Sequence, residues 1–175
     1  MSDIIFNEEK DFEESVIKAL IEHGWESDVI RYPSEEDLIQ NWANILFNNN
    51  KQGTRLNDQP LTSGEMAQIL DQVRNLQSPM ALNEFINGRS ISITRDNPND
   101  PIHLGKEISL KIYDRQEIAL GQSRYQIVQQ PKFKTKSSIL NSRRGDLMLL
   151  INGMPVIHLE LKRSGIPVSE AYNQI

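Results

Sequence analysis

The sequence predicts a mixed α/β fold, with helices in the first half of the chain and strands in the second. From about residue 8 to residue 76, apolar residues recur at spacings of three and four, as on the buried face of a helix. From Arg89 onward they alternate or form short runs, which is typical of strands. With 175 residues, of which 38% are hydrophobic, the chain is long enough to bury a core. We therefore expect a central mixed sheet flanked by helices, the α/β (α+β mixed) class.

Three helices are expected in a helical part that covers about residues 8–88. The first, over 8–23, carries an apolar stripe, and Gly24 should end it so that Trp25 folds back onto that stripe. The second covers about 35–47 and should end at the asparagines 48–50. The third follows Thr62, whose spacing to Glu65 predicts a capping box, and should end before Pro79.

The remaining part, about residues 89–175, is expected to form one sheet whose central strands are the last two. A two-residue Asn-Gly sequence at 152–153 predicts a hairpin between those two strands. Residues 1–175 are expected to form a single domain, and a helix-forming segment after Pro167 suggests a fragment of a longer chain. The expected strands cover 90–94, 107–113, 125–129, 146–151 and 155–162.

Composition excludes several classes of protein. The chain has no cysteine, which excludes disulfides and thiolate metal sites, and its three scattered histidines argue against a histidine-rich site. Any metal would therefore sit on oxygen ligands. Neither a membrane-spanning run nor a signal peptide is evident, so a cytoplasmic location is expected.

Charge is unevenly distributed along the chain. Residues 1–40 contain 12 acidic and 3 basic residues, whereas residues 122–145 contain six basic residues and no acid. The basic stretch ends one residue before Asp146, so it is suited to hold a polyanion there. A solvated loop between strands explains the same charges. The basic residues are Arg124, Lys132, Lys134, Lys136, Arg143 and Arg144.

Asp146 stands at the start of one strand of the predicted hairpin, and Glu160 and Lys162 stand at the end of the next. The geometry of the hairpin determines whether Asp146 lies on the same face of the sheet as the other two. Glu160 and Lys162 share a face because they are two residues apart. An ideal two-residue turn would pair Asp146 with Leu159 and send Glu160 to the other face. We therefore predict a three-residue loop, with Gly153 as a left-handed bulge residue, which brings all three side chains to one side.

Two carboxylates on one face of a sheet repel each other and are costly to desolvate unless a cation lies between them. Mg²⁺ suits such a site because it prefers hard oxygen ligands and keeps water or phosphate in its other positions. Lys162 would then stand beside a metal-bound water or a phosphate. The alternative is that Asp146 pairs with Arg143 or Arg144 and that Glu160 and Lys162 form an ordinary polar strand end.

The residues around this pattern resemble a known nuclease family. Gly145-Asp146, the apolar strand, INGMP at 151–155 and Glu160-Leu161-Lys162 look like the PD-(D/E)XK core, specifically the N-terminal nuclease domain of the restriction (R) subunit of type I restriction-modification enzymes. The opening NEEKDFEESVIKALIEHGW and the Gln129-Gln130 segment with Phe133 are similar to that family too. Gly145 departs from the family pattern, which has proline there.

The resemblance implies a site residue by residue. Asp146 and Glu160 would hold the metal with the main-chain carbonyl of Leu161, and Lys162 would be the catalytic lysine. Glu9 or Glu13 is the candidate supporting acid, although acids at a helix start also suit the helix dipole. Gln174 falls where this family has a glutamine that helps to position DNA. Backbone phosphates would be gripped by Lys132, Lys134, Lys136, Arg143 and Arg144.

The function that the resemblance implies is that of a Mg²⁺-dependent endonuclease domain, with Mn²⁺ as a substitute metal, acting on double-stranded DNA. An ATP-driven translocase would lie beyond residue 175, and modification and specificity subunits would be partners; ATP would serve the full-length protein only. Two alternatives stay open: a repair-type nuclease attached to another helicase, and a non-catalytic domain that holds or docks DNA. His158 is expected to be a core histidine rather than a contact of the metal site.

Overall fold

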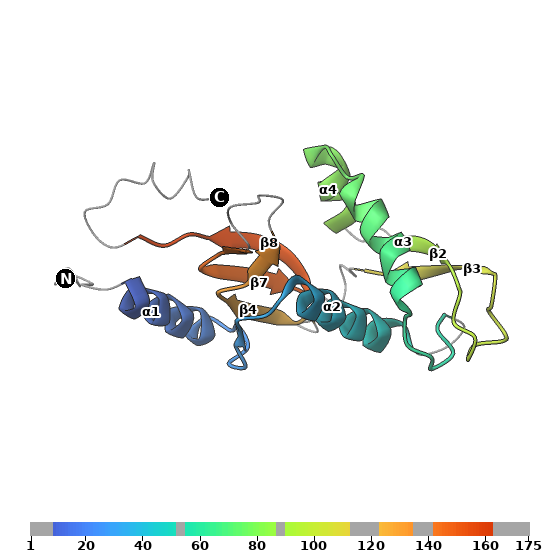
Figure 1. Cartoon of the computed structure of the whole chain (residues 1–175), viewed down its shortest axis with the longest axis horizontal. Coiled ribbons are helices and arrows are strands. Elements are labelled where there is room, and N and C mark those ends of the chain that lie inside the picture. The colour runs from blue at the N-terminus through green and yellow to red at the C-terminus, as the bar shows by residue number, and fades with distance from the viewer. Residues whose placement is uncertain (1–8, 52–54, 87–89, 113–122, 135–141, 163–175) are drawn as a thin grey trace. The chain divides into compact units, whose positions relative to one another are not determined.

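The computed structural model describes residues 9–51, 55–86, 90–112, 123–134 and 142–162 (Figure 1). The chain divides into two compact units, of which the first comprises Met1–Leu38 with Arg124–Ile175 and the second Ile39–Ser123. The single-domain organisation of residues 1–175 stays a prediction.

The first unit is built on a mixed four-stranded sheet in the order β1-β4-β7-β8. The strand β1 (Ile30–Arg31) runs parallel to β4 (Tyr125–Gln129), and the other neighbours, β4 with β7 (Leu147–Ile151) and β7 with β8 (Met154–Leu159), are antiparallel. This confirms a mixed sheet in an α/β fold. The prediction that the last two strands are both central is wrong, because β8 lies at an edge of the described sheet.

A short second ribbon extends β4 and β7 in the same register. Its strands are β5 (Lys132–Lys134) and β6 (Ser142–Arg144), with Lys132 opposite Arg144. Backbone hydrogen bonds continue through the junction, from the Gln130 N–H to the Asp146 carbonyl at 2.7 Å and from the Gly145 N–H to the Pro131 carbonyl at 3.2 Å. The two strand pairs therefore form one long antiparallel ribbon that bends at Gln130, whose φ is +52°.

Helix α1 (Glu9–Glu22) covers one face of this sheet (Figure 1). Its Ile17 forms a buried cluster with side chains of β4 and β7. Gly24, with φ +97°, ends the helix as predicted, and the Trp25 N–H returns to the Leu20 carbonyl at 3.1 Å. Trp25 packs against the cluster, which confirms that it folds back. The sheet side chains of the cluster are Ile127, Leu147 and Leu149, with Leu159 and Leu161 packed on them.

The second unit contains most of α2 (Glu35–Asn50), α3 (Ser63–Arg74), α4 (Pro79–Ile86) and a two-stranded sheet. Thr62 and Glu65 form the predicted capping box of α3. Helix α2 continues through the asparagines that were expected to end it, and α4 was not predicted. None of the helices in the described ranges has the length and apolarity needed to cross a membrane.

Strands β2 (Ser90–Thr94) and β3 (Glu107–Lys111) form a separate antiparallel sheet in this second unit. The expectation that they belong to the same sheet as the last strands is therefore wrong. Ile91 and Ile93 point into the core of the unit, whereas Ser90, Ser92 and Thr94 are exposed. The sheet therefore shields an apolar core on one face only.

Directly after β2, Arg95 is fully buried and ion-paired. Its guanidinium contacts Glu65 at 2.6 Å and Asp100 at 3.0 Å, and its remaining N–H groups reach main-chain carbonyls. Burial alone would raise the pKa of Asp100, but hydrogen bonds from Arg95, His103 and Asn57 outweigh it and hold that pKa below its usual value. The cluster ties the α3 N-terminus to the segment that leaves β2.

Candidate active site

The β7–β8 hairpin combines a two-residue turn with a bulge in the strand that follows. Ile151 pairs with Met154 across Asn152 and Gly153, whose φ values are +51° and +82°. The predicted three-residue loop is therefore wrong, and the turn is the tight one that Asn-Gly favours. The register shifts further along, because Leu150 pairs with Pro155 but Leu149 with Ile157, which leaves Val156 as an extra residue in β8.

The bulge brings Asp146 and Glu160 to the same face of the sheet, which is the effect that the longer loop was expected to have. Beyond it, Leu147 pairs with Leu159, and one step further along this register Asp146 lies opposite Glu160. A turn without the bulge would have set Asp146 opposite Leu159. The sequence thus predicted the shared face of the acids but placed the irregularity in the turn instead of the strand.

The three predicted catalytic side chains lie at the end of the sheet where β7 begins and β8 ends. A carboxylate oxygen of Asp146 accepts a hydrogen bond from the Leu161 N–H at 2.6 Å. The Lys162 ammonium donates to a carboxylate oxygen of Glu160 at 3.3 Å, and the side chains of Glu160 and Lys162 are only 8% and 16% exposed. The structure therefore brings Asp146, Glu160 and Lys162 together around Leu161.

These side chains use the face of the sheet that α1 does not cover. Leu159 and Leu161 pack against the apolar cluster under α1. Because successive residues of a strand point to opposite faces, Glu160 and Lys162 point away from that cluster. The apolar side chains thus hold this segment against the cluster under α1, while the charged side chains of Glu160 and Lys162 lie on the opposite face.

Glu13, a candidate supporting acid, is buried on α1 with only 5% exposure. Its carboxylate accepts hydrogen bonds from the side-chain amides of Gln129 and Gln130, the latter at 3.2 Å. The backbone N–H of Gln130 in turn bonds to the Asp146 carbonyl. Glu13 is thus connected to the strand of Asp146 through one glutamine. Glu9 begins α1, but its side chain lies outside the described residues.

Three acids do not converge here. In the described ranges, no group of three or more His, Asp or Glu side chains is placed so that it could hold a metal ion.

The basic segment lies beside acids from the start of the chain. Arg124 forms a paired contact with Glu26, the shorter N···O distance being 2.6 Å, and this hydrogen bond raises the pKa of Arg124. Lys134 pairs with Glu36, which raises the pKa of Lys134 and lowers that of Glu36. The acidic and basic regions of the sequence thus partly neutralise each other in the first unit.

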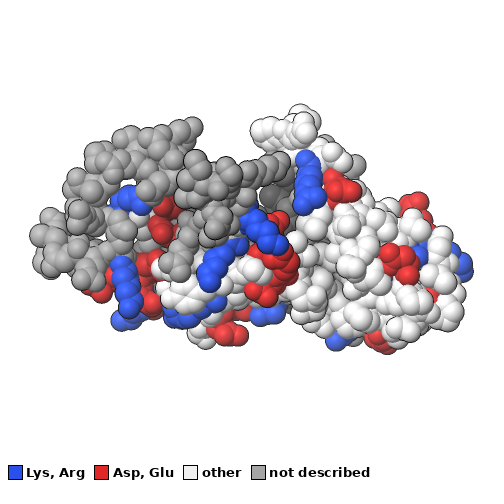
Figure 2. Space-filling view, viewed as in Figure 1, with Lys and Arg blue, Asp and Glu red and all other residues white. Residues whose placement is uncertain are grey.

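Among the coloured residues of Figure 2, basic and acidic side chains are interspersed on the face shown. Lys132 and Lys134 are exposed on β5, next to the backbone of β6 that carries Arg143 and Arg144. The side chains of Arg143 and Arg144 lie outside the described residues, as do Lys136 and Gln174 as a whole. Their role in binding DNA stays a prediction.

His158 is exposed, so its assignment as a core histidine is wrong. It pairs with Met148 across the hairpin, and its ring lies against Gly145: a Cβ added at Gly145 would stand 2.5 Å from the imidazole Nε2. The ring therefore occupies the space beside the residue that precedes Asp146. A larger residue at position 145 would therefore require the His158 ring to move.

Sequence reasoning missed how Gln129 and Gln130 hold Glu13. More than one hundred positions separate the glutamines from the acid, and their amides carry no charge that could mark a site. The left-handed backbone of Gln130 has no sequence signal either, because glutamine rarely adopts it. Only the resemblance of the Gln129-Gln130 segment to the nuclease family pointed to this region.

Comparison with known proteins identifies relatives along almost the whole chain. A family described as type I restriction enzyme R protein N terminus matches residues 6–175. The endonuclease subunit of the type I restriction enzyme SsaAORF53P from Staphylococcus saprophyticus is 29% identical over 98% of this chain. The endonuclease subunit of SauCOLORF180P from Staphylococcus aureus is 27% identical over 97% of the chain.

The chain spans only a part of these relatives. It covers 16% of the length of both staphylococcal proteins. The endonuclease subunit of the type I restriction enzyme EcoprrI from Escherichia coli is 27% identical over 82% of the chain, which covers 49% of that sequence.

Proposed function

The chain belongs to the family of type I restriction enzyme R protein N termini, and on this premise we propose that it is a nuclease domain that hydrolyses DNA phosphodiester bonds. The observation that carries the proposal is the bulged hairpin, which sets Asp146 opposite Glu160 and holds Lys162 beside Glu160. The endonuclease names of the relatives support the same reaction class.

We propose Mg²⁺ as the metal, with Mn²⁺ as a substitute. Asp146 and Glu160 offer hard oxygen donors from facing strands, and Glu160 is largely buried. Mg²⁺ prefers hard oxygen ligands and takes one or two protein carboxylates, so the donor set fits a divalent ion. The carbonyl of Leu161 is the proposed third protein ligand. When bound, the metal supplies an activated water and polarised phosphate oxygens.

Lys162 is the proposed catalytic lysine. Its ammonium is held beside Glu160 at 3.3 Å, so it would lie next to a phosphate seated at the two acids. There it can orient the attacking water and stabilise the negative charge that develops on the phosphate oxygens. The low exposure of Lys162 strengthens this interaction because little water screens it.

The other predicted residues take supporting roles in the proposal. Glu13 would position the strand of Asp146 through Gln130. The exposed lysines of β5, Lys132 and Lys134, would contact backbone phosphates together with Lys136, Arg143, Arg144 and Gln174. Such contacts hold DNA but carry no base information, which suits a nuclease whose target is selected elsewhere.

For the full-length protein we propose ATP-driven translocation before cleavage, together with modification and specificity subunits, in the cytoplasm. The relatives are much longer than this chain and are named as subunits, which supports a larger assembly. ATP would be used by the translocating part alone.

The test is Lys162→Ala in the full-length enzyme assembled with its partner subunits. We expect cleavage of circular DNA carrying the recognition sequence to fall on the order of 10²–10³-fold, the usual loss when a charge-stabilising donor is removed. ATP hydrolysis, measured in the same reaction, should remain. A matched control is Lys18→Ala, which removes an exposed lysine that also pairs with a glutamate, Glu22 at 4.0 Å.

Cleavage that survives Lys162→Ala would contradict the proposed catalytic role and favour a domain that only holds or docks DNA. Cleavage by the chain and its motor without modification and specificity subunits would favour a repair-type nuclease instead.

A further inference from the structure

In the described residues of the second unit, the edge of strand β2 away from β3 has no neighbouring strand, and we call it the free edge. The Arg95 N–H bonds to the Lys106 carbonyl at 2.9 Å, so the backbone N–H of Arg95 points toward the β3 side of the strand. Backbone groups alternate between the two edges of a strand, so those of Thr94, Ser92 and Ser90 face the free edge.

Two glutamines of α3 occupy part of this edge. Gln68 bonds to both backbone groups of Thr94, accepting from its N–H at 2.8 Å and donating to its carbonyl at 2.9 Å. Gln72, one helical turn further, donates to the Ser92 carbonyl at 2.8 Å. The side-chain amides thus substitute for a neighbouring strand along one half of β2.

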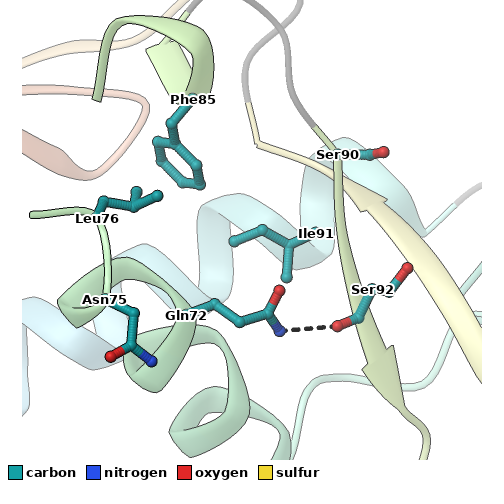
Figure 3. A pocket seen from close by; sticks show the side chains of 7 residues that line it. All are labelled: Gln72, Asn75, Leu76, Phe85, Ser90, Ile91 and Ser92. Atoms are coloured by element: carbon teal, nitrogen blue, oxygen red, sulfur yellow. Dashed lines mark hydrogen bonds between the residues drawn. The ribbon is translucent and has the colours of Figure 1, made fainter. Parts of the chain in front are cut away.

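The other half of the edge is open. In the described part of the chain, neither the Ser92 N–H nor the backbone groups of Ser90 have a hydrogen-bond partner. A cavity of about 360 Å³ lies at this point (Figure 3). Phe85, Leu76 and Ile91 give it an apolar wall, and the polar residues Gln72, Asn75, Ser90 and Ser92 complete the lining.

We propose that this cavity binds a short, uncharged, extended peptide segment of a partner protein. The segment would add to β2 as a strand, taking the free Ser92 N–H and the backbone groups of Ser90, and would place one apolar side chain between Phe85, Leu76 and Ile91. Added strands gain affinity from main-chain hydrogen bonds and specificity from pockets for alternate side chains.

The chemistry of the lining selects this occupant. None of the described lining residues is ionisable, which suits an uncharged ligand. The Gln68 amide closes the edge at Thr94, which limits the added strand to a few residues. The proposal does not depend on the nuclease reaction, and its test contains no DNA.

The experiment begins with selection of seven-residue displayed peptides on the immobilised 175-residue chain. The most enriched sequence is synthesised with blocked termini, and its binding is measured by fluorescence anisotropy. Amide spectra of the ¹⁵N-labelled chain then locate the peptide. We expect saturable binding, with shifts at Ser90 and Ser92 and slowed hydrogen exchange of the Ser92 amide.

Ser92→Pro removes the free N–H without breaking a described hydrogen bond, and proline is tolerated where the N–H of an edge strand faces outward. It should weaken binding about tenfold, the effect of losing one main-chain hydrogen bond. The matched control is Ser109→Pro, because Ser109 lies directly opposite Ser92 and faces the outer edge of β3. It should leave the affinity unchanged.

A second variant, Leu76→Glu, places a charge in the apolar wall and should weaken binding at least about tenfold without altering β2. Failure to enrich any peptide that binds the chain saturably would overturn the proposal. So would equal binding to the Ser92 and Ser109 variants with no effect of Leu76→Glu. A chain dimer that Ser92→Pro dissociates would place a second copy at the edge and would also contradict it.

Discussion

The ion cluster around Arg95 and the candidate site around Lys162 use the same kinds of side chain but satisfy them differently. Arg95 has five N–H donors, and each has an acceptor: Glu65, Asp100 and the carbonyls of Leu56, Gln59 and Pro60. Glu65 also accepts from two backbone N–H groups, those of Thr62 and Asp96. All three charged side chains of the cluster are fully buried.

The candidate site is less completely satisfied. In the described residues, Asp146 has one hydrogen bond, from Leu161, and Glu160 has one, from Lys162. A carboxylate can accept several more, so both acids retain free oxygen lone pairs at a partly open position. The comparison indicates that complete pairing marks a structural cluster, whereas incomplete pairing leaves capacity for a ligand.

The largest expected effect comes from breaking the complete cluster. Arg95→Met leaves Glu65 and Asp100 buried without their cation and should lower the free energy of unfolding of the second unit by about 3–5 kcal/mol. Urea unfolding checks this through Trp42, which is buried in that unit, in a Trp25→Phe background where it is the sole tryptophan.

The matched control removes an exposed arginine. Arg74 pairs with Asp71 at 3.6 Å, and both side chains are mostly exposed. Arg74→Met should cost less than about 1 kcal/mol, as exposed ion pairs usually do. If the two variants were equally stable, complete pairing would not be the source of stability in the Arg95 cluster.

A smaller effect is expected from pH. The pKa of Asp100 in the folded protein lies below its ordinary value of 3.8, so its ionised form stabilises the fold. That contribution is fully present above the unfolded pKa and is lost as the pH falls through the folded one. The unfolding free energy of the second unit should therefore decrease on acidification below about pH 4.

Asp100→Asn identifies the source of this pH dependence. The variant should be less stable than the wild type at pH 6, and the difference should shrink as the pH is lowered toward 2, measured by urea unfolding at each pH. A difference that is independent of pH would show that the charge of Asp100 is not responsible.

The smallest effect on stability is expected at the candidate site. Asp146→Asn keeps an oxygen that can accept from the Leu161 N–H and removes one of two neighbouring negative charges. The unfolding free energy should stay within about 1 kcal/mol of the wild type, measured through Trp25 in a Trp42→Phe background without divalent metal. A loss of 3 kcal/mol or more would make Asp146 a structural residue like Glu65.

Features with a local cause were predictable from the sequence. The capping box of α3 needs only Thr62 and Glu65, and the end of α1 needs only Gly24. Helix α4 was missed because Pro79 was interpreted as a terminator. Proline is equally suited to the first position of a helix, where the hydroxyl of Ser78 accepts from the Ala81 N–H at 3.1 Å.

Features that depend on distant partners were not predictable. The bulge at Val156 depends on how β7 and β8 pair, and neither strand carries a sequence signal for it. The cluster of Arg95 joins residues up to 39 positions away. The placement of Asp146 on the face of Glu160 depends on this bulge, so the sequence also left open an ordinary polar strand end with Asp146 paired to Arg143 or Arg144.

The extra residue in β8 also sets a rule for comparing this hairpin among relatives. Asp146 and Glu160 share a face because one unpaired residue, Val156, lies between them. An insertion or deletion of two residues in the hairpin keeps both acids on the same face, because side chains alternate between faces with a period of two. A change of one residue sends one acid to the opposite face unless a bulge is gained or lost with it. Sequence alignments that place a single-residue gap between the two acids therefore imply either a different bulge or a lost site.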